Sequence, residues 1–338
     1  MKTSAMMLTG VLAAAAFVPR PAPADEFEWK GGEWVARAEP AKGTPEGELA
    51  LIRKHLADDS PRRAANAAED FLENYPNDPR CQEAMYLAGQ AEMQRGRYWD
   101  AYEQFEAQLL RFPKGSFSQR ALLREKEIAE AYLAGRNRRV NWVIRVPAED
   151  DGAEILQRIA EHAPKTKLAE ECLLRVAEHH ASEGDHLAAV QAYDAYLKLF
   201  DKSPRAAEAM LKAAQASLAA YRGTEYDDTP LIEAEQRFRL LAERHPKQAK
   251  QADVARTLEQ IASLRAQKLL ETARFYERTK RPSSAAFYYR KLAEAYPDTT
   301  WGAQARAALE RLGAGEPAPV PTTRPAGVTN EQEGGDQP

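Results

Sequence analysis

The sequence has few of the residues that build β-sheets, disulfide scaffolds or nucleic-acid interfaces. Aromatic residues make up 8% of its 338 residues, it has two cysteines, and β-branched residues are sparse. Lys and Arg total 47 against 51 Asp and Glu, so no overall positive charge attracts a nucleic acid. These deficits argue against an all-β or α/β fold and against a partner bound through its phosphate backbone.

What the sequence has in abundance is alanine, at about a fifth of the chain. Alanine favours helices and lets neighbouring helices pack closely. The apolar fraction of 44% supplies one or two hydrophobic cores, so disorder over most of the chain is not expected. The composition therefore predicts an all-α protein.

The N-terminus has the pattern of a secretory signal. Lys2 is followed by an apolar run from Ala5 to Val18 and by a small-residue cleavage site at Ala22-Pro23-Ala24. The run is shorter than the ~20 residues needed to span a bilayer. We expect residues 1–24 to be a cleavable signal and the product to be periplasmic. No cysteine near the run is available to accept a lipid, so any membrane association is peripheral or through partners.

The two cysteines fall on predicted helices two repeats apart. Because packed helices lie ~8–10 Å apart, Cys81 and Cys172 are too distant to form a disulfide. We expect both to be small buried apolar residues.

Prolines recur at the ends of amphipathic helical stretches, and their spacing reveals internal repeats. Proline cannot continue a helix, and it biases the residue before it toward extended geometry, so each one marks a helix end. The six positions are Pro76, Pro113, Pro164, Pro204, Pro246 and Pro297.

Counting back from these prolines tests the tetratricopeptide (TPR) template, a helix pair whose second helix carries a small residue and then an aromatic. The small residue lies twelve positions before the proline and the aromatic eight. This spacing fits three units, with the pairs Ala101 and Phe105, Ala234 and Phe238, and Ala285 and Tyr289. A fourth unit fits after a three-residue slip, through Ala189 and Tyr193, and Gly89 is the small residue of one first helix. The fold class predicted is therefore a TPR-like superhelical solenoid of antiparallel helix pairs.

The repeats divide the chain into four parts. We expect an irregular lead-in over 25–45, the solenoid over 46–312, and a disordered proline-rich tail over 313–338 after the signal. Within the solenoid we expect inserts from Gly135 to Asp151 and from Gly223 to Pro230, an extra helix from Gln248 to Ala266, and a capping helix from Trp301 to Leu312.

No catalytic or cofactor template occurs in the sequence. It has no glycine-rich phosphate loop, Gly-x-Ser-x-Gly elbow, His-Glu-x-x-His helix or paired Cys-x-x-Cys. The nearest approach to a metal cluster is His179, His180 and His186, which we interpret as solvated turn residues. We therefore expect no enzyme activity, cofactor or metal. The alternative from another class, a hydrolase or metal enzyme using these histidines, predicts stoichiometric zinc in the purified protein.

An arginine-rich insert is the first candidate for partner contact. Arg138, Arg139, Trp142 and Arg145 lie in a cationic, amphipathic segment that interrupts the helices. The competing interpretation is that Trp142 and its neighbours cover a core edge while the arginines reach water. The acidic run 149–151 beyond it either neutralises the arginines or caps the following helix.

A second set of candidates follows from solenoid geometry. Such arrays bind peptides or domains along a concave surface lined by the first helix of each pair. The exposed positions expected there are Tyr86, Gln90, Met93, Arg124 and Glu127.

Several segments together resemble the TPR domain of the outer-membrane assembly factor BamD. They are the repeats with long inserts, the spacer from Arg222 to Asp227, and the closing motifs Ala273-Arg274-Phe275-Tyr276, Ala285-Ala286-Phe287-Tyr288-Tyr289 and Tyr296-Pro297-Asp298-Thr299. The resemblance covers roughly Glu46 to Leu312. It implies a periplasmic scaffold in which early repeats face unfolded substrate and late repeats face the assembly machine's membrane component. Family members are typically lipoproteins, and this sequence departs from them in lacking the acceptor cysteine.

The function expected is therefore that of a non-enzymatic periplasmic scaffold that binds proteins during outer-membrane β-barrel assembly. The alternative is a general periplasmic TPR adaptor for cell-wall or secretion machinery. Partners co-purified from the envelope distinguish the two.

Overall fold

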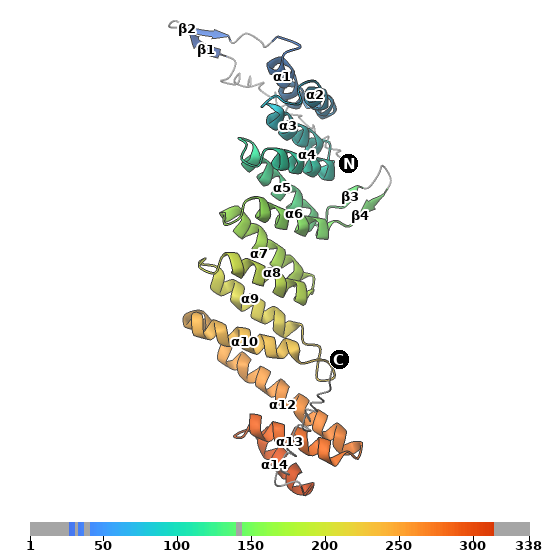
Figure 1. Ribbon diagram of the computed structural model, residues 1–338, viewed down its shortest axis with the longest axis vertical. Helices are drawn as coiled ribbons and strands as arrows, with labels where there is room; N and C mark the ends of the chain where they lie inside the picture. The colour runs from blue at the N-terminus through green and yellow to red at the C-terminus, as the bar shows by residue number, and fades with distance from the viewer. Residues whose placement is uncertain (1–26, 31–32, 37–40, 140–143, 314–338) are drawn as a thin grey trace, which may run out of the picture. The chain divides into compact units, whose positions relative to one another are not determined.

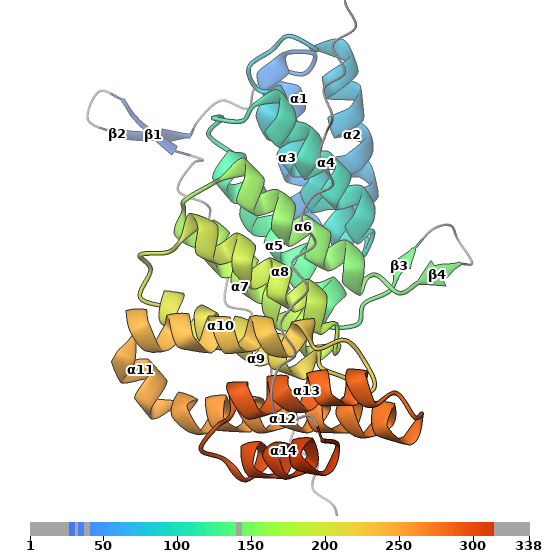
Figure 2. The ribbon, with the colours of Figure 1, turned by 60° about the horizontal axis from the view of Figure 1, so that its bottom comes forward.

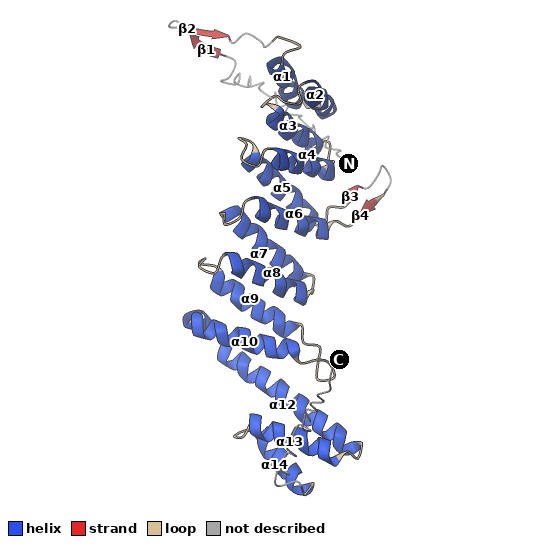
Figure 3. Cartoon of the chain, viewed as in Figure 1, coloured by secondary structure: helices blue, strands red, loops and turns tan. Residues whose placement is uncertain are grey.

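The computed structural model describes residues 27–30, 33–36, 41–139 and 144–313, and most of them are helical (Figures 1 and 3). The expected signal, residues 1–24, and nearly all of the expected tail lie outside the described residues. The chain divides into two compact units, residues 1–121 and 122–338, whose boundary falls inside α5 (Ser118–Leu133).

In the first unit, each helix packs against the next one in the chain: α1 on α2, α2 on α3, and α3 on α4. A short antiparallel hairpin, in which Phe27 pairs with Ala36, precedes the helices. The lead-in that we expected to be irregular therefore contains two strands. The elements are β1 (Phe27–Lys30), β2 (Glu33–Ala36), α1 (Pro45–Ala57), α2 (Pro61–Asn74), α3 (Cys81–Gln94) and α4 (Tyr98–Arg111).

The second unit continues the same scheme. Contacts join α6 to α7, α7 to α8, α8 to α9, α9 to α10, α10 to α12, α12 to α13 and α13 to α14, so each helix covers its successor (Figure 2). The elements after α5 are β3 (Arg138–Arg139), β4 (Arg145–Val146), α6 (Glu149–His162), α7 (Lys167–Ser182), α8 (His186–Leu199), α9 (Ala206–Ala219), α10 (Thr229–Arg244), α11 (Pro246–Gln251), α12 (Val254–Arg278), α13 (Pro282–Ala295) and α14 (Thr300–Arg311). The predicted fold class, an all-α array of antiparallel helix pairs, is confirmed.

The repeat residues have the environments that the template predicts. Phe105, Phe238 and Tyr289 are at most 2% exposed, and the alanine four residues before each of them is fully buried. Five of the six repeat prolines directly follow a helix C-cap residue, and Pro204 lies four residues after the C-cap Phe200. The prolines therefore mark helix ends, as expected.

Gly89 sets the distance between α3 and α4. A Cβ atom at this position would lie 2.5 Å from a ring carbon of Phe105, closer than real side chains approach. Because Phe105 is fully buried, its ring has little room to move aside. Glycine here lets the Phe105 ring pack directly against the α3 backbone.

The structure corrects one helix prediction. The extra helix expected from Gln248 to Ala266 does not end at Ala266, because α12 continues without a break to Arg278. Its N-cap, Asp253, has a left-handed backbone with φ of 50°, which separates α12 from the short α11. One 25-residue helix thus packs against α10 with one part of its length and against α13 with another.

Cys81 and Cys172 are both free and fully buried, as predicted. Burial raises the pKa of the Cys172 thiol to about 12, so the thiol is protonated at neutral pH. Among the helices that the structure describes, none combines the length and apolar character needed to cross a membrane.

Candidate protein-interaction site

The concave-surface candidates on α3 are less exposed than expected. Tyr86 is 7% exposed, and its ring centroid lies 5.7 Å from that of Phe105 and 5.3 Å from that of Phe117. The prediction that Tyr86 is an exposed contact is therefore wrong, because its ring belongs to the core of the first unit. Gln90 and Met93 are half-buried.

Arg124, the candidate on α5, is half-buried and pairs with Glu127 of the same helix at 2.7 Å. Such a pair between exposed side chains one turn apart contributes a few tenths of a kcal/mol, about 0.3–0.5. A partner carboxylate would have to compete with Glu127 for this guanidinium.

The arginine-rich insert forms a hairpin at the start of the second unit. Arg138 lies opposite Val146, and Arg139 lies opposite Arg145. Arg139 and Arg145 are both exposed. Two like charges directly opposite each other are unfavourable in a strand pair, and an anionic partner would relieve that repulsion. Trp142 lies outside the described residues.

The acidic run beside the hairpin neutralises one of these arginines. Arg138 donates to Asp151 at 3.1 Å, as one of the two interpretations of the run predicts. Burial raises the pKa of the Asp151 carboxyl, although the nearby Arg138 charge lowers it. The first turn of α6 contains Glu149, Asp150 and Asp151, whose negative charges interact favourably with the positive end of the helix dipole. The N-cap itself is Ala148.

The histidine cluster is placed differently from the prediction. His179 is 4% exposed and lies 5.6 Å from the ring of His180, so it is a buried residue of α7 rather than a solvated turn residue. Across the described residues, no group of three or more His, Cys, Asp or Glu side chains is arranged to hold a metal ion.

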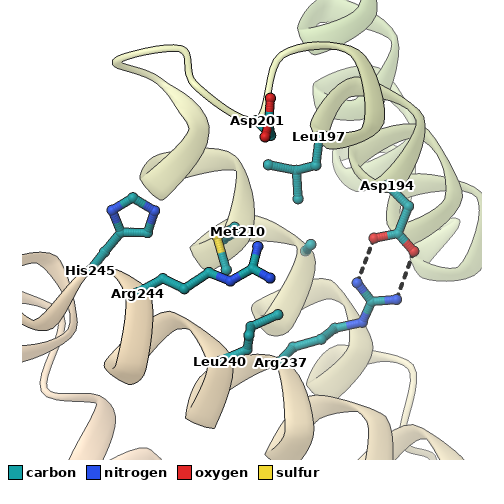
Figure 4. Close-up of a pocket in the computed structure, with 9 residues that line it drawn as sticks. Asp194, Leu197, Asp201, Met210, Arg237, Leu240, Arg244 and His245 are labelled. Atoms are coloured by element: carbon teal, nitrogen blue, oxygen red, sulfur yellow. Dashed lines mark hydrogen bonds and ion pairs between the residues drawn. The ribbon is translucent and has the colours of Figure 1, made fainter.

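A cavity of about 220 Å³ lies between α8, α9 and α10 (Figure 4). Apolar side chains from all three helices line it, including Leu197, Met210 and Leu240. Leu240 is 37% exposed and marks the rim. The lining also contains polar and charged residues: Asp194, Asp201, Arg237, Arg244 and His245.

The two arginines of this pocket have different roles. Arg237 donates two hydrogen bonds to Asp194, at 2.6 and 2.7 Å, and this pairing raises the pKa of the guanidinium (Figure 4). A bidentate pair of this kind fixes both side chains as part of the wall. Arg244 is exposed, and its guanidinium points over the pocket near Met210. The site can therefore hold an apolar group on its floor and an anionic group on Arg244.

Two further hollows have a similar position between helices that the structure describes. In the second unit, a hollow of about 450 Å³ lies between α6, α7 and α8 and thus shares α8 with the α8–α10 pocket. In the first unit, one of about 510 Å³ lies between α2, α3 and α4. Each lies between the second helices of consecutive pairs, whereas the sequence argument had placed binding on the first helices.

Part of the second unit matches a known protein family. Residues 150–314 match the family model YfiO, described as an outer membrane lipoprotein. This segment, just under half of the chain, is BamD-like, so the resemblance inferred from the sequence is confirmed for it. Residues 46–149, which we also expected to share the resemblance, lie outside the match. Both hollows of the second unit lie within the matched segment.

Solved structures similar to this chain are TPR proteins. The C-terminal part of a TPR repeat-containing protein from Cytophaga hutchinsonii is 13% identical, with 78% of this chain and 88% of that chain covered and a TM-score of 0.33. A tetratricopeptide repeat protein from Parabacteroides merdae is 12% identical, with 80% and 98% covered and a TM-score of 0.32. No curated protein matches the sequence.

Proposed function

We propose that the protein is an exported, non-enzymatic scaffold that binds protein partners during the assembly of outer-membrane β-barrels. The observation that carries the proposal is the coincidence of the BamD-like segment, residues 150–314, with the helix pairs that form the two hollows of the second unit. In this proposal residues 1–24 are the export signal, residues 46–312 are the scaffold, and partners hold the protein at the outer membrane.

The chemistry of the α8–α10 pocket indicates what kind of partner it fits. Its lining offers an apolar floor, a guanidinium at the rim and a wall fixed by the Arg237–Asp194 pair, with no hydroxyl or thiol nucleophile among its residues. This combination suits non-covalent binding of a peptide or a loop. A partner segment with an apolar side chain next to a carboxylate would fill the floor and pair with Arg244.

The exposed arginines of the β3–β4 hairpin provide a second, separate contact. Arg139 and Arg145 form a local positive patch on a hairpin that projects from the helices (Figure 2). Such a patch raises the rate of encounter with an acidic surface more than it raises affinity. We assign it a steering role, with the pocket supplying the specific contact.

The proposal is tested by affinity capture from envelope extracts with the full chain as bait. We expect an outer-membrane assembly component to be enriched, and Arg244→Glu to reduce its recovery by about tenfold, the loss expected from an interface charge pair worth ~1.4 kcal/mol. Arg256→Glu, an equal change of charge at an exposed α12 position outside the pocket, is the matched control and leaves recovery unchanged.

Two outcomes contradict the proposal. Recovery of no outer-membrane biogenesis component by the unaltered bait would remove the assembly role. Recovery of peptidoglycan or secretion enzymes in their place would favour the general adaptor.

A further inference from the structure

Two phenylalanines near the end of the second unit are exposed where the fold does not require them. Phe275 on α12 is 51% exposed and Phe287 on α13 is 56% exposed. The core between these helices is already filled by buried residues such as Ala273, Tyr289 and Leu292. Leaving two phenylalanine rings in water forfeits their hydrophobic stabilisation, which points to a second role for them.

The exposed rings belong to a continuous aromatic band that crosses α12 and α13. Phe275 contacts Tyr276 with ring centroids 5.5 Å apart, Tyr276 stacks on Tyr288 at 5.4 Å and 10°, and Tyr288 contacts Phe287 at 5.3 Å. The two tyrosines also pack against the core of this helix group. The band is therefore held in place before anything binds, which lowers the entropy cost of binding.

Exposed basic residues are close to the band in sequence. Arg274 precedes Phe275 on α12, and Arg278, Lys280 and Arg281 lie at the end of α12 and in the turn that leads to α13. A surface of ordered aromatic rings flanked by positive charge favours an extended, proline-rich segment that also carries acidic residues, because proline rings pack on aromatic faces and polyproline II helices need little ordering.

The end of the described chain lies beside this surface. Arg311, the last residue of α14, pairs with Glu277 of α12 at 3.6 Å, and Leu312 packs against the same core cluster as Tyr276 and Tyr288. Figure 2 shows α12, α13 and α14 packed together, and their contacts agree. The chain beyond Gly313 therefore starts within two residues of a group that is anchored next to the band.

The sequence that follows has the chemistry the band favours. It contains Pro317, Pro319, Pro321 and Pro325 within nine residues, and residues 326–338 carry three acidic side chains and no basic one. From Gly313 to Glu316 an extended chain reaches about 13 Å. Nine residues of polyproline II helix span about 28 Å, enough to cross two helices ~10 Å apart.

From these observations we infer that the proline-rich segment 317–325 of this chain docks on the aromatic band and covers it. The acidic residues at 331–336 then lie within reach of the basic turn. The tether supplies an effective concentration in the millimolar range, so a contact with a Kd of only ~1 mM keeps the band covered about half of the time. An outside partner of the band must displace the tail, which makes the tail an internal competitor. This inference does not depend on the proposed function.

Photo-crosslinking of the full chain tests the inference. With Phe287→p-benzoylphenylalanine, we expect irradiation to link position 287 to a peptide from residues 314–338 of the same molecule. A mixture of ¹⁴N- and ¹⁵N-labelled protein distinguishes links within one chain from links between copies. Replacing the four prolines of the segment with serine should lower the yield of this link by roughly fivefold or more, because the preordered helix is lost.

Controls separate docking from random collision. A probe at Leu187, which is 62% exposed on α8 of the same unit, should give no tail link. If the Phe287 variant does not fold, the same probe at Phe275 gives the same readout. Absence of a tail link from both positions overturns the inference. So does a link that joins only differently labelled molecules, which would identify a second copy as the occupant, or a yield unchanged by the proline replacements.

Discussion

The close packing of Gly89 against Phe105 gives the sharpest prediction about stability. Gly89→Ala adds a methyl group 2.5–2.8 Å from three ring carbons of Phe105. Overpacking of this kind costs about 1–3 kcal/mol, whereas replacing glycine by alanine within a helix gains about 0.5–1 kcal/mol. We therefore expect Gly89→Ala to destabilise the α3–α4 pair by up to about 2.5 kcal/mol.

A second substitution reverses the sign of this effect. Phe105→Ala removes all three ring carbons that the new methyl group would meet, so in that background the gain in helix propensity remains and Gly89→Ala stabilises by about 0.5–1 kcal/mol. The coupling energy of the double-mutant cycle is then about 1–3 kcal/mol.

Hydrogen exchange measured by mass spectrometry is the suitable assay, because repeat arrays need not unfold in one step. Peptides from α3 and α4 report local opening, and about 1.4 kcal/mol corresponds to a tenfold change in exchange rate. Effects that add within about 0.5 kcal/mol would show that Gly89 and Phe105 do not touch, and the packing argument would fail.

Three further predictions follow from buried and paired groups. Burial raises the pKa of the Cys172 thiol to about 12, so the stabilisation by the protonated thiol is present below pH 9.0 and is lost as the pH rises toward 12. We therefore expect alkaline titration to lower the stability of the wild type more than that of Cys172→Ala. We also expect the native thiol not to react with a disulfide reagent at pH 8. Asp194→Ala leaves the half-buried Arg237 without its bidentate acceptor, and we expect exchange in α10 to rise about fivefold, the equivalent of ~1 kcal/mol. Tyr289→Phe removes the 2.7 Å hydrogen bond to Glu277 and should weaken the α12–α13 pair by about 1 kcal/mol, seen as roughly fivefold faster hydrogen exchange in α13; unchanged exchange would mean that water replaces this bond without cost.

The sequence predicted the helix pairs because each repeat contains residues that indicate where its second helix ends. Proline ends the second helix, and the alanine and aromatic positions before it face the neighbouring helices, so local spacing alone determines both boundary and buried face. Phe105 and Tyr289 are buried as that spacing requires. Between Gln248 and Arg278 no proline indicates a helix boundary. The break before α12 comes from the left-handed backbone of Asp253, and an aspartate in the sequence does not predict that conformation.

Exposure and cavities were harder to predict, for a physical reason. Helical periodicity predicts Tyr86 on a free face, but α3 packs against both α2 and α4, and nine of its residues are buried. The α8–α10 pocket combines residues from three helices, as far apart as Asp194 and His245 in sequence. A hollow of this kind forms where side chains from separate helices leave space unfilled between them. Helical periodicity indicates which face of one helix is apolar, but it does not predict such a gap between helices.

We propose that the second unit binds proteins on the side formed by the second helices of its helix pairs. The most direct measurement is photo-crosslinking in living cells from position 240, at the rim of the α8–α10 pocket, compared with position 123, an exposed leucine on α5. The account predicts discrete protein adducts from position 240 that include an outer-membrane assembly component, and few from position 123. No protein adduct from position 240, or the same adducts from both positions, would contradict it.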